Sequence, residues 1–223
     1  MRSLALLCVL AGSLLPSCAA PEPRYSAAFI ERAPRSILVL PPLDESIETD
    51  GTYVTYAALT RPLLESGYYV FPPAVVDRLM RENGLPTPAE MHQAPLERLV
   101  DIFDPDAVLL VRITNWGTSY EVLQSVSRVG LEARLIDADT GALIWEDARL
   151  GQQGSSSGGG GIAGMLAGAL VNQVVTDISD PCEAIARNTA KQLLGPGSSL
   201  PRGPYDPEYA TTFAAAAAAL DER

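Results

Sequence analysis

The chain has few of the residues on which metal sites, histidine-based catalysis and disulfide scaffolds depend. Among its 223 residues there are one histidine and three cysteines, whereas each of those sites needs several such groups converging in space. Basic residues are also scarce: 16 stand against 27 acidic ones, a net charge of −11. Nucleic-acid binding relies on neutralising phosphates with basic groups. We therefore expect no metal, no cofactor, no nucleic-acid partner and no catalytic activity.

The N-terminus has the pattern of a secretory signal. Met1-Arg2 is a short basic start, residues 3–15 are almost wholly apolar, and the run closes on a small residue, Ser17, before Cys18. An apolar run of this length falls well short of the roughly 20 residues that a helix needs to cross a bilayer. We therefore expect residues 1–17 to be a signal peptide that is removed.

The end of this signal resembles the lipobox of bacterial lipoproteins. The resemblance implies cleavage before Cys18, a diacylglycerol on its thiol and a further acyl chain, such as palmitate, on the new amine. Three chains would anchor the protein firmly without spanning the membrane. Because Ala19 rather than Asp follows the cysteine, the sorting rule of such lipoproteins implies the outer membrane, with the body in the periplasm or at the cell surface. The alternative is an ordinary cleaved signal with a chance cysteine.

A polar, proline-interrupted tether is expected over residues 18–34, and a single α/β domain over residues 35–195. The domain opens with an apolar strand, a helix with three- and four-residue spacing, and a second apolar strand, at residues 36–40, 52–66 and 68–71. A strand, a helix and a strand in so short a stretch predict a parallel crossover unit. Pro62 is expected to kink or split the helix.

The pattern later changes from helical to period two. Two helices and an apolar central strand are expected first, at residues 74–83, 95–103 and 107–113. Leu131, Ala133 and Leu135 then alternate with Glu132 and Arg134, so one face of that strand is buried and the other wet. A turn at residues 137–141 leads to a partner strand at 142–150. The fold predicted is a mixed sheet, parallel at its start and an antiparallel meander later, with helices packed on it.

Glycine is concentrated late in the chain. Residues 151–161 are expected to form a flexible Gly/Ser-rich loop, and Gly160, Gly164 and Gly168 follow one another at four-residue spacing. Small residues at this spacing let another backbone approach closely. The segment could pack on its own sheet, form a helix–helix contact between subunits, or enter a membrane as part of an oligomer. A last helix is expected at residues 182–194, followed by a flexible tail at 196–223.

Two further groups are candidate sites. A loop containing Asp44, Glu45 and Ser46, with Asp50 beyond it, follows the first strand, where open α/β sheets usually bind ligands. It could take a hard cation or a peptide amine, or be a solvated acidic loop, since it lacks the oxygen spacing of a calcium site.

Cys182 is the one free thiol expected in the mature chain. It falls in the first turn of a helix, where the dipole favours a thiolate, but Asp180 and Glu183 oppose ionisation. His92, between two prolines, is expected in a surface loop. A buried or idle thiol is therefore preferred to a Cys–His nucleophile. Four tyrosines on neighbouring elements are expected mainly in the core: Tyr53, Tyr56, Tyr68 and Tyr69.

Three segments together resemble a known family. They are RSILVLPPLDES at 35–46, PLLESGYYVFP at 62–72 and TNWGTSY at 114–120. They resemble a domain-of-unknown-function family of Gram-negative lipoproteins that includes a meningococcal surface antigen. The likeness runs from the lipobox to about Leu194. It implies an α/β domain similar to the N-terminal domain of the Tol-system propeller protein, a dimer, and an accessory role in envelope transport. It also implies a gene that neighbours one for a curli-secretion-like pore lipoprotein. It implies no catalytic residues.

The leading functional hypothesis is a non-catalytic binding or scaffold subunit of an envelope transport or surface-assembly complex. The anchor, the missing catalytic groups and the family likeness favour it. The alternatives are a membrane-associated oligomer formed through the glycine segment and an envelope enzyme that uses the acidic loop or Cys182.

The anchor is tested at Cys18. Mass spectrometry of the mature protein should show an N-terminus at residue 18 that carries acyl chains. Cys18→Ser should abolish the acyl mass, because no thiol remains to accept diacylglycerol, whereas Cys8→Ser within the signal should leave it unchanged. An unmodified amino end on the native molecule would contradict the lipobox interpretation.

Overall fold

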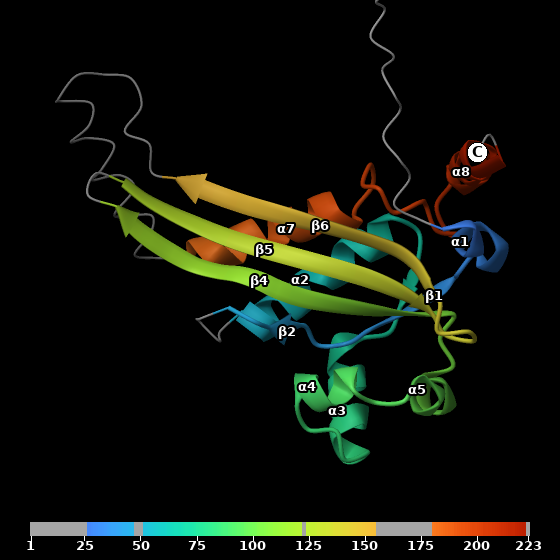
Figure 1. Cartoon of the computed structure of the whole chain (residues 1–223), viewed down its shortest axis with the longest axis horizontal. Helices are drawn as coiled ribbons and strands as arrows, with labels where there is room; N and C mark the ends of the chain where they lie inside the picture. Colours follow the sequence, from blue (N-terminus) through green and yellow to red (C-terminus); the bar gives the residue numbers. More distant parts are fainter. Residues whose placement is uncertain (1–25, 47–50, 122–123, 155–179, 222–223) are drawn as a thin grey trace, which may run out of the picture.

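The computed structural model describes residues 26–46, 51–121, 124–154 and 180–221, which form a mixed sheet with helices on both faces (Figure 1). The strands are β1 (Ser36–Val39), β2 (Leu43–Asp44), β3 (Tyr69–Val70), β4 (Ala107–Glu121), β5 (Gln124–Asp137) and β6 (Leu143–Gly154). The helices are α1 (Ala27–Arg32), α2 (Gly51–Glu65), α3 (Pro73–Glu82), α4 (Pro88–His92), α5 (Leu96–Phe103), α7 (Pro181–Leu194) and α8 (Tyr209–Asp221).

The sheet joins a short parallel part to a long antiparallel part. Its strand order is β3-β1-β4-β5-β6, and β2 pairs with β4 farther along the same edge as β1. β1 pairs parallel with both β3 and β4, and β2 pairs parallel with β4. The long strands β4, β5 and β6 are antiparallel. The structure thus confirms the fold class predicted from the sequence, including the parallel crossover through α2.

The central strand β4 carries a bulge that keeps its large side chains on one face. Val111 and Ile113 are buried on the face that α2 and α7 cover, and the pairing with β5 shifts between Ile113 and Asn115. After this shift Trp116, an even-numbered position, is buried in the same cluster. Because a strand alternates its faces residue by residue, only the extra residue of the bulge permits this change of parity.

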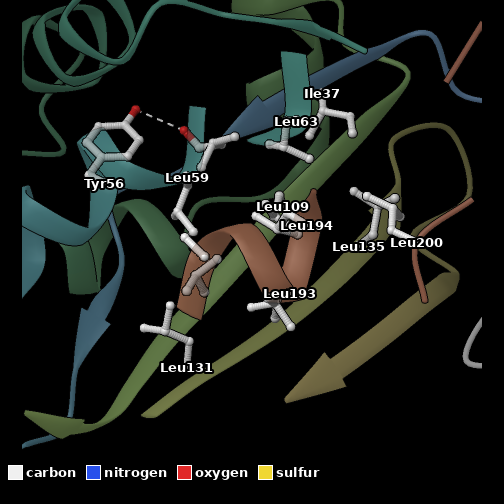
Figure 2. Packing of buried hydrophobic residues seen from close by; sticks show 14 of the residues in the cluster. Ile37, Tyr56, Leu59, Leu63, Leu109, Leu131, Leu135, Leu193, Leu194 and Leu200 are labelled. Carbon is white, nitrogen blue, oxygen red and sulfur yellow. Dashed lines mark hydrogen bonds between the residues drawn. The ribbon is translucent and has the colours of Figure 1, made fainter. Parts of the chain in front are cut away.

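The main core lies between the sheet and the helices α2 and α7 (Figure 2). Leu59 and Leu63 of α2 and Leu193 and Leu194 of α7 are fully buried against the sheet. Tyr56 lies at the margin of this cluster, where its hydroxyl donates to the carbonyl oxygen of Val39 at 2.9 Å (Figure 2). A buried tyrosine needs such a partner, since an unpaired hydroxyl in the core is costly.

A smaller cluster fills the opposite face of the parallel strands. Leu38 and Leu40 of the first strand segment meet Val76 and Met80 of α3, and Met91 of α4 completes the contact. Figure 1 shows α3, α4 and α5 gathered beside β1 and β2, away from β5 and β6. Only the parallel part of the sheet is therefore sandwiched between helices on both sides.

Of the two effects expected of Pro62, a kink or a split, the structure excludes the split. Pro62 neither splits nor ends α2, which runs unbroken from Gly51 to Glu65. The proline is buried and lies within the last turn of the helix. Only one helical hydrogen bond is therefore lost there, and packing against the core compensates for it.

The sequence analysis also missed α4. Its Thr87 accepts from the backbone of Glu90, and the Glu90 side chain accepts from the backbone of Thr87, a complete capping box with Pro88 at the first helical position. The letters Thr-Pro-Ala-Glu carry this signal. His92 therefore ends a helix and does not lie in a loop.

The expected tether and tail both contain packed structure. Within residues 18–34, α1 buries Phe29, and the backbone nitrogen of Ser26 donates to the carbonyl oxygen of Ile144 at 2.8 Å. Within residues 196–223, Leu200 is only 4% exposed, and the Tyr68 hydroxyl donates to the carbonyl oxygen of Pro201. Both segments extend the body beyond the boundaries predicted at residues 35 and 195.

The chain from Leu194 to Asp206 is held by a backbone contact that we call the glycine clamp, formed by Ser66, Gly67, Gly203 and Asp206. The nitrogen of Gly203 donates to the oxygen of Ser66 at 2.7 Å, and the nitrogen of Tyr205 donates to the oxygen of Gly67 at 3.0 Å. A side chain on Gly67 would collide with the Asp206 backbone. Position 67 therefore requires glycine for two reasons: the backbone of Asp206 approaches it closely, and its φ of +82° is left-handed.

Substitutions at two glycines distinguish the effect of the left-handed φ from the effect of the close contact. Gly84 has nearly the same φ, +80°, but faces open space, so Gly84→Ala should cost only the left-handed strain of about 1–2 kcal/mol. Gly67→Ala should lower the free energy of unfolding by at least about 2 kcal/mol more, because the clamp must also open. Urea denaturation measures both variants. Equal losses would show that the clamp contributes nothing to stability.

Candidate functional site

The acidic loop at residues 44–46 is stabilised by hydrogen bonds within its own turn. Asp44 ends β2, and its Oδ1 accepts from the backbone nitrogen of Ser46 at 2.9 Å and from the Ser46 hydroxyl at 2.5 Å. The Glu45 nitrogen donates to the oxygen of Ile113 at 3.0 Å, which continues the β2–β4 pairing. These bonds shape a loop at the end of a strand, and Asp50 lies outside the described residues.

The carboxylates near this loop do not converge on a common point. Glu45 faces Arg112 at 3.5 Å, and Arg112 also pairs with Glu132 at 3.1 Å. Asp44 Oδ2 is buried beside the first residue of α2 and has no hydrogen-bond partner among the described residues. In the part of the chain that the structure describes, no group of three or more His, Cys, Asp or Glu side chains is arranged to hold a metal ion.

A polar cavity of about 330 Å³ lies beside the loop. It follows β4 beyond the point where β2 stops, and its walls are Glu45, Ser46, residues 114–119 and Arg128. The loop and the third segment of the family likeness, predicted separately from the sequence, thus line the same cavity.

Cys182 is buried, and its surroundings do not activate it as a nucleophile. It is 3% exposed, in the first turn of α7, where its backbone nitrogen donates to the capping Asp180 at 2.9 Å. Burial raises the pKa of its thiol, and the charge of Asp180 adds to that rise, while Gly117 and Thr118 partly oppose it. The thiol is therefore held in its protonated form.

His92 belongs to the other face of the sheet. Its Nε2 lies 2.9 Å from the carbonyl oxygen of Pro41, and burial lowers the pKa of the imidazole. Cys182 packs in the cluster beneath α2 and α7, whereas His92 ends α4 beside the cluster of the opposite face. The sheet separates the two side chains, so they form no Cys–His pair.

The tyrosines divide into two pairs. Tyr56 and Tyr68 are buried, as expected, whereas Tyr53 and Tyr69 are each 49% exposed. The Tyr53 hydroxyl accepts from Arg81 at 2.5 Å.

The glycines singled out from the sequence, Gly160, Gly164 and Gly168, lie outside the described residues.

A larger hollow, which sequence reasoning missed, lies on the bare face of the antiparallel strands. This sheet groove has a volume of about 540 Å³ and is lined by Leu43, Ala89, His92, Gln93, Leu110, Arg112, Glu132, Arg134 and Glu146. A second hollow of about 530 Å³ shares Glu132, Arg134 and Glu146 and continues toward Ser26. The alternation of charge on one face of residues 131–135 was the only sequence signal for it.

The outer edge of the sheet is partly closed by its own side chains. At Ala148 of β6 the backbone nitrogen donates to Asp147 Oδ1 at 2.7 Å, and the carbonyl accepts from Arg149 at 3.0 Å. Ser199 bonds the buried Asp147 at 2.7 Å and ties the C-terminal segment to the same strand. Pairing of these backbone groups makes the middle of β6 a poor template for strand addition.

Taken together, a lipobox-type N-terminus and a mixed α/β body with a bare sheet face define a small α/β lipoprotein. Among the described residues no helix is long and apolar enough to cross a membrane. Residues 24–205 match the GNA1162-like lipoprotein family, and the chain belongs to that family.

Two relatives illustrate the membership. The Neisseria meningitidis lipoprotein NMB1124/NMB1162 is 40% identical over 195 residues, which cover 87% of this chain and 90% of the relative. The crystal structure of lipoprotein GNA1162 from Neisseria meningitidis has 43% sequence identity and a TM-score of 0.54, covering 64% of this chain and 99% of that one. The family predicted from the three sequence segments is thereby confirmed, while the likeness to the Tol-system propeller stays a prediction.

The state of Cys182 can be measured by thiol labelling. In the native mature protein a water-soluble disulfide reagent should react slowly at pH 7 to 8, and the rate should still rise above the pH at which an ordinary thiol is fully ionised, because burial raises the pKa. The same protein in denaturant supplies the exposed-thiol control. Rapid native labelling at pH 7 would restore the reactive-cysteine hypothesis.

Proposed function

We propose that this lipoprotein is a non-catalytic binding or scaffold subunit of an envelope transport or surface-assembly complex. It is anchored to the outer membrane through acylated Cys18 and acts as a dimer. Membership of a lipoprotein family and the N-terminal pattern support the anchor. The observation that carries the binding role is the sheet groove, a hollow between the end of α4 and the outward face of the long strands.

The chemistry of the groove favours binding over catalysis. Arg112 is shared between Glu45 and Glu132, and Arg134 lies 3.9 Å from Glu146. Side chains in such ion pairs neutralise one another and are roughly half exposed, so they stay accessible to a partner from outside. Paired charges of both signs on a flat sheet can instead exchange partners with a complementary protein surface and set its orientation.

The dimer and the envelope partner are tested together by crosslinking in cells. A photoreactive amino acid at Glu45 or Glu146 should give adducts with an envelope protein, because Glu146 lines the sheet groove and Glu45 lines the polar cavity and pairs with Arg112 of the groove. The matched control is Glu97, which is also exposed but lies on α5, outside the lining of the hollows and of the polar cavity. Two differently tagged copies expressed together should also co-purify.

The outcomes that contradict the proposal are clear. Adducts of equal yield from Glu97 would show random collision rather than a binding face. No adduct from Glu45 or Glu146, in cells where the protein fractionates with the envelope, would remove the groove as the binding surface. Recovery of a single tag would exclude the dimer.

A further inference from the structure

The C-terminal helix α8 lacks the charged face of an ordinary surface helix. No charged residue occurs from Tyr209 to Leu220, a stretch that includes six consecutive alanines at 214–219. Tyr209, Thr212, Phe213 and Ala217 are half-buried, while Ala210, Thr211, Ala214, Ala215 and Ala218 are exposed. A surface helix normally turns charged and polar side chains outward. Here the outward face is apolar apart from one threonine.

The start of α8 is fixed to the body. The glycine clamp holds residues 203–206, and Arg202 pairs with Asp206 at 2.7 Å and with Glu208 at 3.4 Å. The nitrogen of Glu208 donates to Asp206 Oδ1 at 2.7 Å. Tyr205, just before the helix, is 68% exposed. α8 therefore extends in a direction set by the body, and its apolar face is held in a defined place.

That place is beside the N-terminal end of the described chain. α8 packs against α1, and Figure 1 shows the two helices together at one end of the molecule. Ser26 lies eight positions after Cys18, and eight residue steps at full extension span at most about 29 Å. A bilayer attached to Cys18 is thus within reach of α8.

We propose that α8 rests on the surface of the phospholipid bilayer that holds the acyl chains of Cys18, with Tyr205 and the alanine face toward the lipid. The proposal rests on the lipid anchor of the proposed function. At about 20 Å, a helix of 13 residues is too short to cross the membrane and lies along it. Weak apolar contact suffices, because the anchor keeps the helix at a high effective concentration beside the bilayer.

The position of the helix favours lipid over a second copy of the chain as its occupant. The family match ends at residue 205, so α8 lies outside the matched stretch, and it packs against α1, where the chain leads toward the anchor. Because the helix carries no basic residue, its contact is apolar and should change little with salt.

The test uses the mature lipidated protein in vesicles of phosphatidylethanolamine and phosphatidylglycerol that contain a nitroxide lipid. Ala215→Cys on α8 and Ala89→Cys on α4, both exposed, each receive an environment-sensitive fluorophore, which the buried Cys182 does not accept. We expect nitroxide quenching of the Ala215 label to exceed that of the Ala89 label by about twofold or more. Flotation of the vesicles reports the anchor separately.

A second part of the experiment places charged residues on the exposed face of α8. Adding Ala214→Glu and Ala218→Glu should reduce quenching of the Ala215 label to the level of Ala89, with flotation unchanged, because charged groups leave the apolar contact. Glutamate is a good helix former, so the helix itself should persist. The matched control, Ala74→Glu on α3, should leave quenching as it was.

Three results would overturn the proposal. If the protein does not float with the vesicles, the lipid anchor fails and this inference fails with it. If it floats but both labels are quenched equally, only the contact of α8 with lipid is wrong. If the fluorescence of the Ala215 labels is quenched between copies of the protein but is unchanged by the nitroxide lipid, α8 pairs with a second copy instead.

Discussion

The architecture depends on the pairing of β4, which joins the two parts of the sheet. Along its first half β4 bonds in parallel to β1 and β2, and along its whole length it bonds antiparallel to β5. Its first residues are apolar on both faces, since helices cover both sides there. Beyond Arg112 only the face toward α2 and α7 is covered. One strand thus passes from a buried interior to a half-exposed surface, and the bulge near Asn115 keeps Trp116 in the core.

Unequal covering of the two faces explains where the molecule can bind. α2 and α7 protect one side of the long strands, whereas α3, α4 and α5 protect only the parallel part of the other. The strip left open carries paired charges, as the outward face of an antiparallel strand commonly does. The two ends of the described chain are organised differently, because α1, the glycine clamp and α8 gather at one end of the body.

Local chemistry made much of the fold predictable. The crossover through α2, the turn at residues 137–141 and the capping of α7 by Asp180 all follow from patterns within a few residues of one another. The capping box at Thr87 was equally readable and was overlooked. The burial of Leu200 and the contact between Gly67 and Gly203 could not be predicted, because each depends on residues far apart in the sequence that only the folded chain brings together.

The sequence alone determined the lipoprotein family and the class of fold, because a run of family letters and a change of hydrophobic period are local properties. Only the tertiary structure decided that Cys182 and His92 lie on opposite faces of the sheet, that the acidic loop borders a cavity with residues 114–119, and that α8 lies beside α1. Those relations depend on strand order and helix packing, which the energy of the whole core selects and no short segment encodes.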